Sequence, residues 1–306
     1  RYNKNNLIYI SYLNIVSTTE REIAKLFTSN SLRAIASGDV SPLEKIINNK
    51  NLRSNVNTTS IDDIYSSAFE FLSRNYRNEY VYKNLIARKI LRSKHSLQSS
   101  VLLSEFRVGQ NKADLVLLNG CSTCYEIKTE YDSLNRLEDQ LQSYIQLFEK
   151  VYVVCPSSLQ VDVEAIIPHS VGIIVLTDNN TLRTIKDAIS NNIFDISLMM
   201  KSLRKEEYLD IAENIYGLKI DVPNTQVFDL CFKILNKSDR AVVNNLFLKT
   251  LKKYRKNNIE AINTLPSPLT NALISFKFNK NDIKNLISFF SEKELNVLSN
   301  FKREVE

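Results

Sequence analysis

Hydrophobic and polar positions change their spacing twice along this chain. From residue 18 to about residue 92, apolar residues recur with helical spacing, as on the face of Ile64, Ala68, Phe71 and Leu72. Short apolar runs separated by turns follow, and helical spacing returns after about Asp195. This pattern predicts an α/β protein with a helical N-terminal region (1–59), a core of helices and strands (60–194) and a helical C-terminal domain (195–306).

The core is expected to hold five strands. A helix opened by Ser60 and a second helix from about Asn78 precede the first strand, and helices connect the later strands. The predicted strands are Val101–Val108, Ala113–Leu118, Cys124–Thr129, Val151–Cys155 and Gly172–Leu176. The predicted helices of the core and C-terminal domain include 133–150, 161–167, 203–216, 225–235, 239–256, 268–276 and 280–301.

Three charged residues interrupt the apolar second and third strands. Asp114 opens one of them, and Glu126 and Lys128 alternate within the other. Side chains alternate faces along a strand, so the loop around Asn119-Gly120 must have an odd number of residues for Asp114 and Glu126 to share a face. We predict a loop of three or five residues here, because an even loop would separate the carboxylates.

Two carboxylates beside an amine are suited to metal-assisted phosphate chemistry. Asp114, Glu126 and the backbone carbonyl of Ile127 would supply oxygen ligands for Mg²⁺, with Mn²⁺ as a substitute. Lys128 would orient the attacking water and balance negative charge on the phosphate. A solvated polar face of a hairpin is the alternative interpretation of the same residues.

The distribution of charge agrees with a polyanionic partner. Residues 1–100 carry a net charge of +7, residues 101–194 carry −5, and residues 195–306 carry +4. An acidic centre between basic flanks is typical of a protein that binds a metal and a nucleic acid, although ordinary surface variation also produces such differences.

Other classes of chemistry find little support in the composition. Five scattered glycines form no phosphate-binding loop, and two histidines leave few ways to form a Ser/His/Asp triad. Cys121 and Cys124 form a lone CxxC, which we interpret as small residues of a hairpin turn. The chain has no apolar run long enough for a membrane span, and we expect a cytoplasmic protein without a signal peptide.

Together these residues resemble the PD-(D/E)XK nuclease superfamily, with Asp114 in the Asp position and Glu126-Ile127-Lys128 as the ExK element. Ala113 stands where the family has Pro. Gln140 and Tyr144 look like the QxxxY element of RecB-type members. The resemblance implies a restriction-endonuclease-like core in the order αβββαβ with a mixed sheet, and a role for Gln140 and Tyr144 in positioning active-site groups or nucleic acid.

The resemblance also implies an acidic residue on the helix before the first strand. Glu79 is our first choice and Glu70 the second, while Glu105 and Glu130 are further candidates for the site. Segments that begin at Lys25, Asn78, Leu103 and Ala113 are similar to an uncharacterised bacterial family known by a locus-tag name, over roughly residues 20–155. That family implies no substrate.

The resulting expectation is a Mg²⁺-dependent nuclease that cuts DNA in phage defence or mobile-element biology. The alternatives are a non-cleaving module that binds nucleic acid or protein, and an RNA-cleaving effector. A protein partner on the C-terminal domain and a homo-oligomer stay open. Basic residues before the first strand, interleaved with tyrosines, are candidates for nucleic-acid contacts: Lys83, Arg88, Lys89, Arg92 and Lys94, with Tyr76, Tyr80 and Tyr82.

Overall fold

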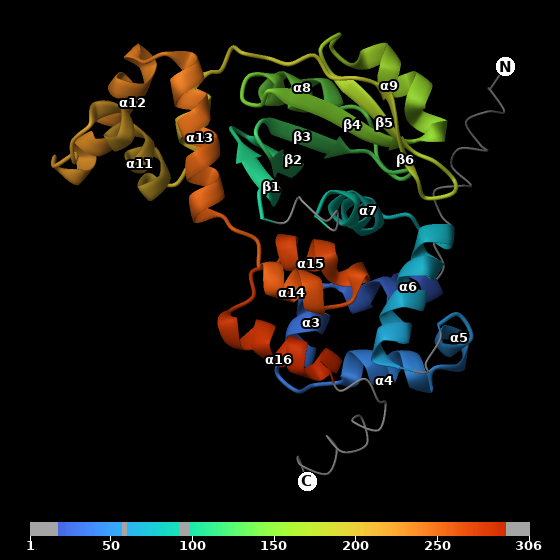
Figure 1. The fold of residues 1–306 in the computed structure, drawn as a ribbon. Coiled ribbons are helices and arrows are strands. Elements are labelled where there is room, and N and C mark those ends of the chain that lie inside the picture. The colour runs from blue at the N-terminus through green and yellow to red at the C-terminus, as the bar shows by residue number, and fades with distance from the viewer. Residues whose placement is uncertain (1–17, 57–59, 92–97, 292–306) are drawn as a thin grey trace. The chain divides into compact units, whose positions relative to one another are not determined.

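The structure is a computed structural model that describes residues 18–56, 60–91 and 98–291. Its chain divides into two compact units (Figure 1). The first comprises residues 1–88 and 258–306, and the second comprises residues 89–257. These units differ from the three consecutive regions expected from the sequence, because the last helices pack with the N-terminal ones rather than forming a domain with residues 195–257.

The first unit is helical throughout its described part. Ser60 opens helix α6 by accepting a hydrogen bond from the Asp63 N–H (3.1 Å), as the sequence predicted. The elements of this unit are α2 (Thr18–Ala24), η1 (Lys25–Phe27), α3 (Ser29–Ala36), α4 (Ser41–Asn48), α5 (Lys50–Arg53), α6 (Ile61–Asn75), most of α7 (Glu79–Leu91), α14 (Ile259–Thr264), η3 (Ser267–Leu269), α15 (Thr270–Ser275) and α16 (Lys280–Ser291).

Aromatic packing and one buried amide join the early helices of this unit to its late helices. The ring of Tyr65 lies 5.6 Å from that of Phe27 and 5.2 Å from that of Phe290. The buried side chain of Asn84 accepts from the Asn271 N–H (2.8 Å) and donates to the Ser267 carbonyl (3.3 Å). The apolar faces of the C-terminal helices are therefore buried against residues more than 180 positions earlier.

The second unit is built on one six-stranded mixed sheet in the order β1-β2-β3-β4-β5-β6 (Figure 1). The first three strands are antiparallel, β3, β4 and β5 are parallel, and β6 is antiparallel to β5. The strands are β1 (Val101–Val108), β2 (Asn111–Leu118), β3 (Ser122–Ile127), β4 (Lys150–Pro156), β5 (Gly172–Leu176) and β6 (Leu182–Lys186). The predicted mixed α/β class is confirmed.

Helices complete this unit. Helices α8 and α9 pack on the central strands, and helices α10 to α13 extend the same hydrophobic core beyond edge strand β1 (Figure 1). The helices are α8 (Leu137–Ile145), η2 (Ser157–Leu159), α9 (Gln160–Ile166), α10 (Ile196–Ser202), α11 (Lys205–Tyr216), α12 (Asn224–Lys237) and α13 (Arg240–Tyr254).

Several predicted boundaries were wrong. Strand β6 was not predicted, because it is an edge strand whose side chains are half-buried or exposed and which has no continuous apolar run. Helix α8 is shorter than the predicted 133–150. It begins at Leu137, after a bend and a turn at 134–136, and ends at Ile145, and Lys150 already belongs to β4. Short helices α5, α10 and α14 were not predicted.

The edge of β1 is closed by one side chain. The Asn257 amide accepts from the Leu102 N–H and donates to the Leu102 carbonyl, both at 2.8 Å. The Asn257 side chain takes the place that a neighbouring strand would occupy. It satisfies the backbone N–H and carbonyl of Leu102, a fully buried residue on this edge strand.

Asn257→Ala is therefore expected to lower the free energy of unfolding by about 1–3 kcal/mol, because it leaves two backbone groups without their partner. Urea denaturation followed by circular dichroism measures this change. Lys256→Ala, at the exposed neighbouring position, is the control. An equal effect of the two substitutions would contradict the assigned role of Asn257.

None of the helices in the described ranges is long and apolar enough to cross a membrane.

Candidate functional site

The hairpin between β2 and β3 has the odd loop that the sequence analysis required. Leu118 pairs with Ser122, so three residues, Asn119 to Cys121, form the loop. Gly120 has φ +104°, a conformation that glycine adopts without strain. If this register is continued along both strands, Asp114 lies opposite Glu126. Opposite residues share a face of the sheet, as the odd loop predicted for these two carboxylates.

Side-chain alternation is interrupted beside Asp114. Leu103 and Phe106 belong to the same hydrophobic cluster although they are three residues apart on β1, and so do Ala113 and Val116 on β2. A regular strand would send each such pair to opposite faces. Both strands therefore change their alternation at the same level, which is why their register is unchanged.

The residues at this irregularity are acidic. Glu105, on β1, has φ +54°, which is uncommon for a residue other than glycine. The register places it opposite Asp114, and their carboxylate oxygens lie within 4.8 Å of each other. Strained backbone of this kind is often found at functional sites. The position of the Asp114 carboxylate therefore depends on this irregularity as well as on the odd number of residues in the β2–β3 loop.

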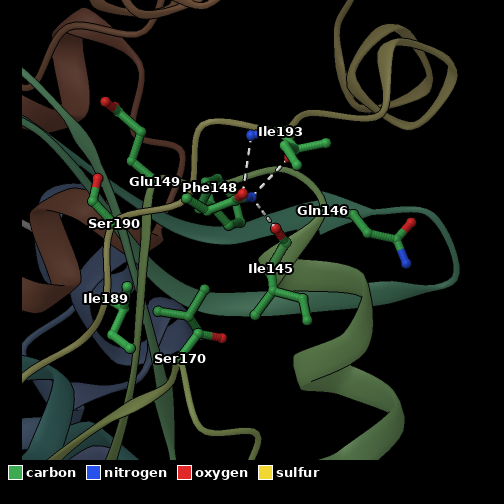
Figure 2. A pocket seen from close by; sticks show the side chains of 10 residues that line it. Ile145, Gln146, Phe148, Glu149, Ser170, Ile189, Ser190 and Ile193 are labelled. Carbon is green, nitrogen blue, oxygen red and sulfur yellow. Dashed lines mark hydrogen bonds between the residues drawn. The ribbon is translucent and has the colours of Figure 1, made fainter.

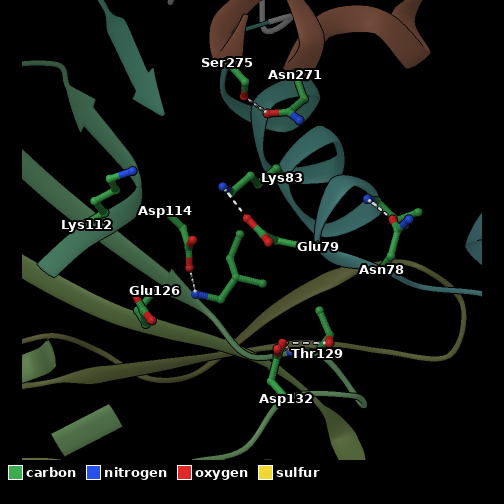
Figure 3. A network of polar contacts seen from close by, with 12 residues as sticks. Asn78, Glu79, Lys83, Lys112, Asp114, Glu126, Thr129, Asp132, Asn271 and Ser275 are labelled. Carbon is green, nitrogen blue, oxygen red and sulfur yellow. Dashed lines mark hydrogen bonds and ion pairs between the residues drawn. The ribbon is translucent and has the colours of Figure 1, made fainter. Parts of the chain in front are cut away.

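Asp114 is attached to the third strand through the backbone. Its Oδ2 accepts a hydrogen bond from the Ile127 N–H at 2.7 Å (Figure 3). In a continued antiparallel ladder that N–H would face β2, so the carboxylate lies where the two strands cease to pair. Asp114 is consequently held next to the Glu126-Ile127-Lys128 segment. The predicted use of the Ile127 carbonyl as a metal ligand stays a prediction.

Glu126 and Lys128 form a buried ion pair. The Lys128 Nζ lies 2.9 Å from the Glu126 Oε1 and donates to the Gln140 Oε1, also at 2.9 Å. Glu126 is 2% exposed and Lys128 8% exposed. The second carboxylate oxygen, Glu126 Oε2, is buried and has no hydrogen-bond partner among the described residues.

This environment makes the Glu126 charge costly. Burial raises the pKa of Glu126, and the positive charge of Lys128 and its hydrogen bond oppose the increase. A buried carboxylate oxygen without a donor loses its hydration without replacement. A divalent cation would supply that missing interaction, so the donor set (Glu126, with Asp114 on the adjacent strand) fits a hard metal ion such as Mg²⁺.

The two QxxxY residues lie on one face of α8, as their spacing predicted. Gln140 accepts from Lys128, and Tyr144 is fully buried. The Tyr144 hydroxyl neighbours Glu126, but it donates its single proton to the Lys112 carbonyl (2.7 Å). Burial, together with the charge of Glu126, raises the pKa of Tyr144, so it remains a neutral donor. The structure brings both residues next to the ion pair, and Gln140 contacts it directly. Their predicted role in positioning active-site groups or nucleic acid stays a prediction.

The other acidic candidates lie on elements other than β2 and β3. Glu79 belongs to the other unit, where it is exposed and forms an ion pair with Lys83 (Figure 3). Glu70, in the same unit, pairs with Arg74. Their part in the site stays a prediction. Glu130 lies in the loop after β3, half-buried, and its role also stays a prediction.

Two of the residues proposed to contact nucleic acid, Lys83 and Tyr82, are buried, and the others stay candidates. Lys83 is buried, Lys89 donates to the Leu182 carbonyl (3.1 Å), and the Arg88 guanidinium lies 5.8 Å from the Phe69 ring centre. Tyr82 is fully buried and Tyr80 donates to the Pro268 carbonyl (2.7 Å). Arg92 and Lys94 lie outside the described residues. Periodic spacing did not distinguish exposed from buried positions here.

All four cysteines are free thiols, and Cys121 and Cys124 lie in the hairpin loop and in β3. Burial, followed by the charges of Glu126 and Asp114, raises the pKa of Cys124 well above its usual value. Both carboxylates therefore act on the same buried thiol, which stays protonated. A reactive thiolate at this position is not supported.

A separate pocket of about 310 Å³ lies at the end of α8 (Figure 2). Its lining is mainly apolar, with Ile145, Phe148 and Ile189 among its residues, and Asn191 links the Ile145 and Ile193 carbonyls. The charged residues of the candidate site do not line it.

Similar proteins were found in three comparisons. The family model of bacteriophage P4 protein cII matches residues 72–286. Protein cII of Enterobacteria phage P4 is 33% identical over 93 residues, which are 30% of this chain and 35% of that relative, so the match spans about a third of the relative's length. A solved protein of unknown function from Silicibacter pomeroyi is similar over 39% of this chain and 79% of its own, with 15% identity and a TM-score of 0.30. Because the family model covers more than half of the sequence, the chain belongs to the family of bacteriophage P4 protein cII.

Proposed function

We propose that this protein is a metal-dependent nuclease with a restriction-endonuclease-like core, and that it hydrolyses phosphodiester bonds of DNA. The observation that carries the proposal is the buried Glu126 Oε2, which has no hydrogen-bond partner in the described part of the chain although Oε1 is paired with Lys128. Asp114 is held beside it through the Ile127 peptide. A structural ion pair alone gives no reason for this arrangement.

The order of helices and strands in the core supports the resemblance to the PD-(D/E)XK nuclease superfamily. A helix precedes three antiparallel strands, α8 follows them, and β4 then pairs in parallel with β3. This order matches the αβββαβ core that the motif implies. The namesake of the family is a phage protein, which supports a role in phage or mobile-element biology.

The residues have distinct tasks in this proposal. Glu126 and Asp114 would hold a Mg²⁺ or Mn²⁺ ion, with Glu105 as a further carboxylate close to Asp114. When bound, the ion would polarise the phosphate and lower the pKa of a water molecule. Lys128 would place its ammonium group beside the phosphate and stabilise the developing negative charge, while Gln140 keeps that group oriented.

Metal binding and cleavage can be tested together. We expect the purified protein to bind Mn²⁺ in calorimetry, and to cleave duplex or single-stranded DNA faster than RNA with Mg²⁺ or Mn²⁺. Asp114→Asn should abolish cleavage and weaken Mn²⁺ binding. Because burial raises the pKa of Glu126, Mn²⁺ affinity should fall as the pH decreases through that raised value.

Asp139→Asn, an exposed change of the same kind on α8, is the control. Loss of binding and cleavage in both variants, or no metal-dependent cleavage of any substrate by the wild-type protein, would overturn the proposal. Preferential cleavage of RNA would retain the nuclease but reassign its substrate.

A further inference from the structure

Two cations face each other near the end of the β1–β2 hairpin. Arg107 and Lys112 are directly paired across the strands, and both are exposed. The Arg107 Nε donates to the Gly109 carbonyl (3.1 Å). Within the described ranges, neither side chain has an acidic partner. Directly opposed residues have Cβ atoms about 5 Å apart, so like charges there repel and destabilise the pair.

The neighbouring residues place these cations relative to the candidate site. Phe106 and Ala113 belong to the hydrophobic cluster, so the next residues, Arg107 and Lys112, point away from it. Glu105 and Asp114 lie two residues from Arg107 and Lys112 along the same two strands. Figure 3 shows Lys112 and Asp114 on the same side of β2. A basic pair therefore adjoins an acidic pair on one exposed part of the sheet.

We propose that Arg107 and Lys112 together bind the substrate phosphate adjacent to the one that is cleaved. This inference rests on the nuclease proposal and assigns these two side chains as positioning residues for the nucleic-acid backbone. One phosphate between two cations would convert their mutual repulsion into two attractive contacts. The Arg107 guanidinium still has free N–H groups that match phosphate oxygens, and the Lys112 ammonium is a mobile point charge.

Such contacts hold the substrate in register without reading bases. They also place the scissile phosphate at a defined distance from Asp114, because the basic pair and the acidic pair lie on the same two strands. The pair should consequently affect substrate binding and KM strongly and the chemical step weakly.

The test compares two double variants with the same loss of charge. Arg107→Gln/Lys112→Gln removes the proposed contacts, and Arg183→Gln/Lys186→Gln removes an Arg and a Lys from β6, at the opposite edge of the sheet. Binding of a fluorescent DNA duplex is measured by anisotropy at several salt concentrations, without Mg²⁺ or Mn²⁺. The slope of log Kd against log salt should fall by about 0.9 in the first variant, since the two cations together neutralise one duplex phosphate. The slope of the second variant should match that of the wild type.

Cleavage assays separate the two proposals. We expect KM of the first variant to rise about tenfold with kcat within a factor of three, and Lys112→Arg to retain the wild-type slope because it keeps the charge. Equal slopes for both double variants would overturn this inference even if the wild type cleaves DNA. A reduced slope in a protein that cleaves nothing would support the phosphate contacts and overturn the nuclease proposal alone. If the double variant unfolds in a thermal melt, Lys112→Gln replaces it, with an expected slope decrease smaller than the value of about 0.9 for one complete phosphate contact.

Discussion

Replacing Lys128 by Met is expected to lower kcat for metal-dependent cleavage by about 10²- to 10³-fold, the usual effect of removing one group that stabilises transition-state charge. The Lys128 ammonium is fixed by two acceptors, Glu126 and Gln140, each at 2.9 Å. It is thus preorganised beside the carboxylate that would hold the metal. Single-turnover cleavage with saturating Mg²⁺ measures the change.

A second consequence distinguishes this role from a structural one. Lys128 opposes the burial that raises the pKa of Glu126. Without that cation the pKa of Glu126 should rise further, so the variant should need a higher pH than the wild type to bind Mn²⁺. Calorimetric titrations across a pH series measure the displacement.

Two other substitutions serve as references for Lys128→Met. Gln140→Leu removes one acceptor while the positive charge remains, so we expect a smaller loss in kcat, of about tenfold. The pH dependence should move in the same direction by less than in Lys128→Met, because Gln140 opposes the raised pKa of Glu126 less than Lys128 does. Lys201→Met, at an exposed position on α10, should leave both quantities unchanged. Equal kcat values for Lys128→Met and wild type would remove Lys128 from the chemical step.

Arg255→Ala is expected to lower the free energy of unfolding by about 3–5 kcal/mol, because it leaves a fully buried carboxylate without its counter-charge. Two nitrogens of Arg255 donate to Glu207 at 2.6 Å each, and Glu207 has no exposed surface. Glu207 also accepts from the N–H of Arg204 (2.7 Å), the N-cap residue of α11. The guanidinium lies 4.9 Å from the ring centre of Phe106, on β1.

Urea denaturation measures the loss, and the double variant Glu207→Gln/Arg255→Met tests its cause. Removing both charges should be less destabilising than removing one, because no unpaired charge remains in the interior. Lys253→Ala removes an exposed ion pair with Asp210 and should have a much smaller effect. If Arg255→Ala were no more destabilising than Lys253→Ala, the assigned importance of this buried pair would be wrong.

This pair also matters for the candidate site. Arg255 follows α13, contacts α11 through Glu207, and lies over Phe106 beside the irregular residue Glu105. Asn257, two residues later, binds the backbone of Leu102. The C-terminal helices of the second unit are therefore attached to the strand that bears one of the acidic groups, so loss of stability there should also disturb the site.

Local sequence signals determined the elements that build the core. Runs of apolar residues located β1 to β5, because strands buried on both faces need such runs, and Ser60 located the start of α6, because its hydroxyl satisfies a free N–H of the first turn. The spacing of Asp114, Glu126 and Lys128, and of Gln140 and Tyr144, identified residues that the fold brings to adjacent strands and one helix face.

Other features depended on contacts between distant residues, for which the sequence carries no local signal. The irregularity at Glu105 and Asp114, the pairing of Arg107 with Lys112, and the return of α16 to the N-terminal helices arise only when separate segments pack. Burial likewise separated Lys83 and Tyr82, now interior residues, from a predicted binding surface. A local pattern can specify which side chains share a strand or helix face, whereas their exposure and partners depend on what covers that face in the folded chain.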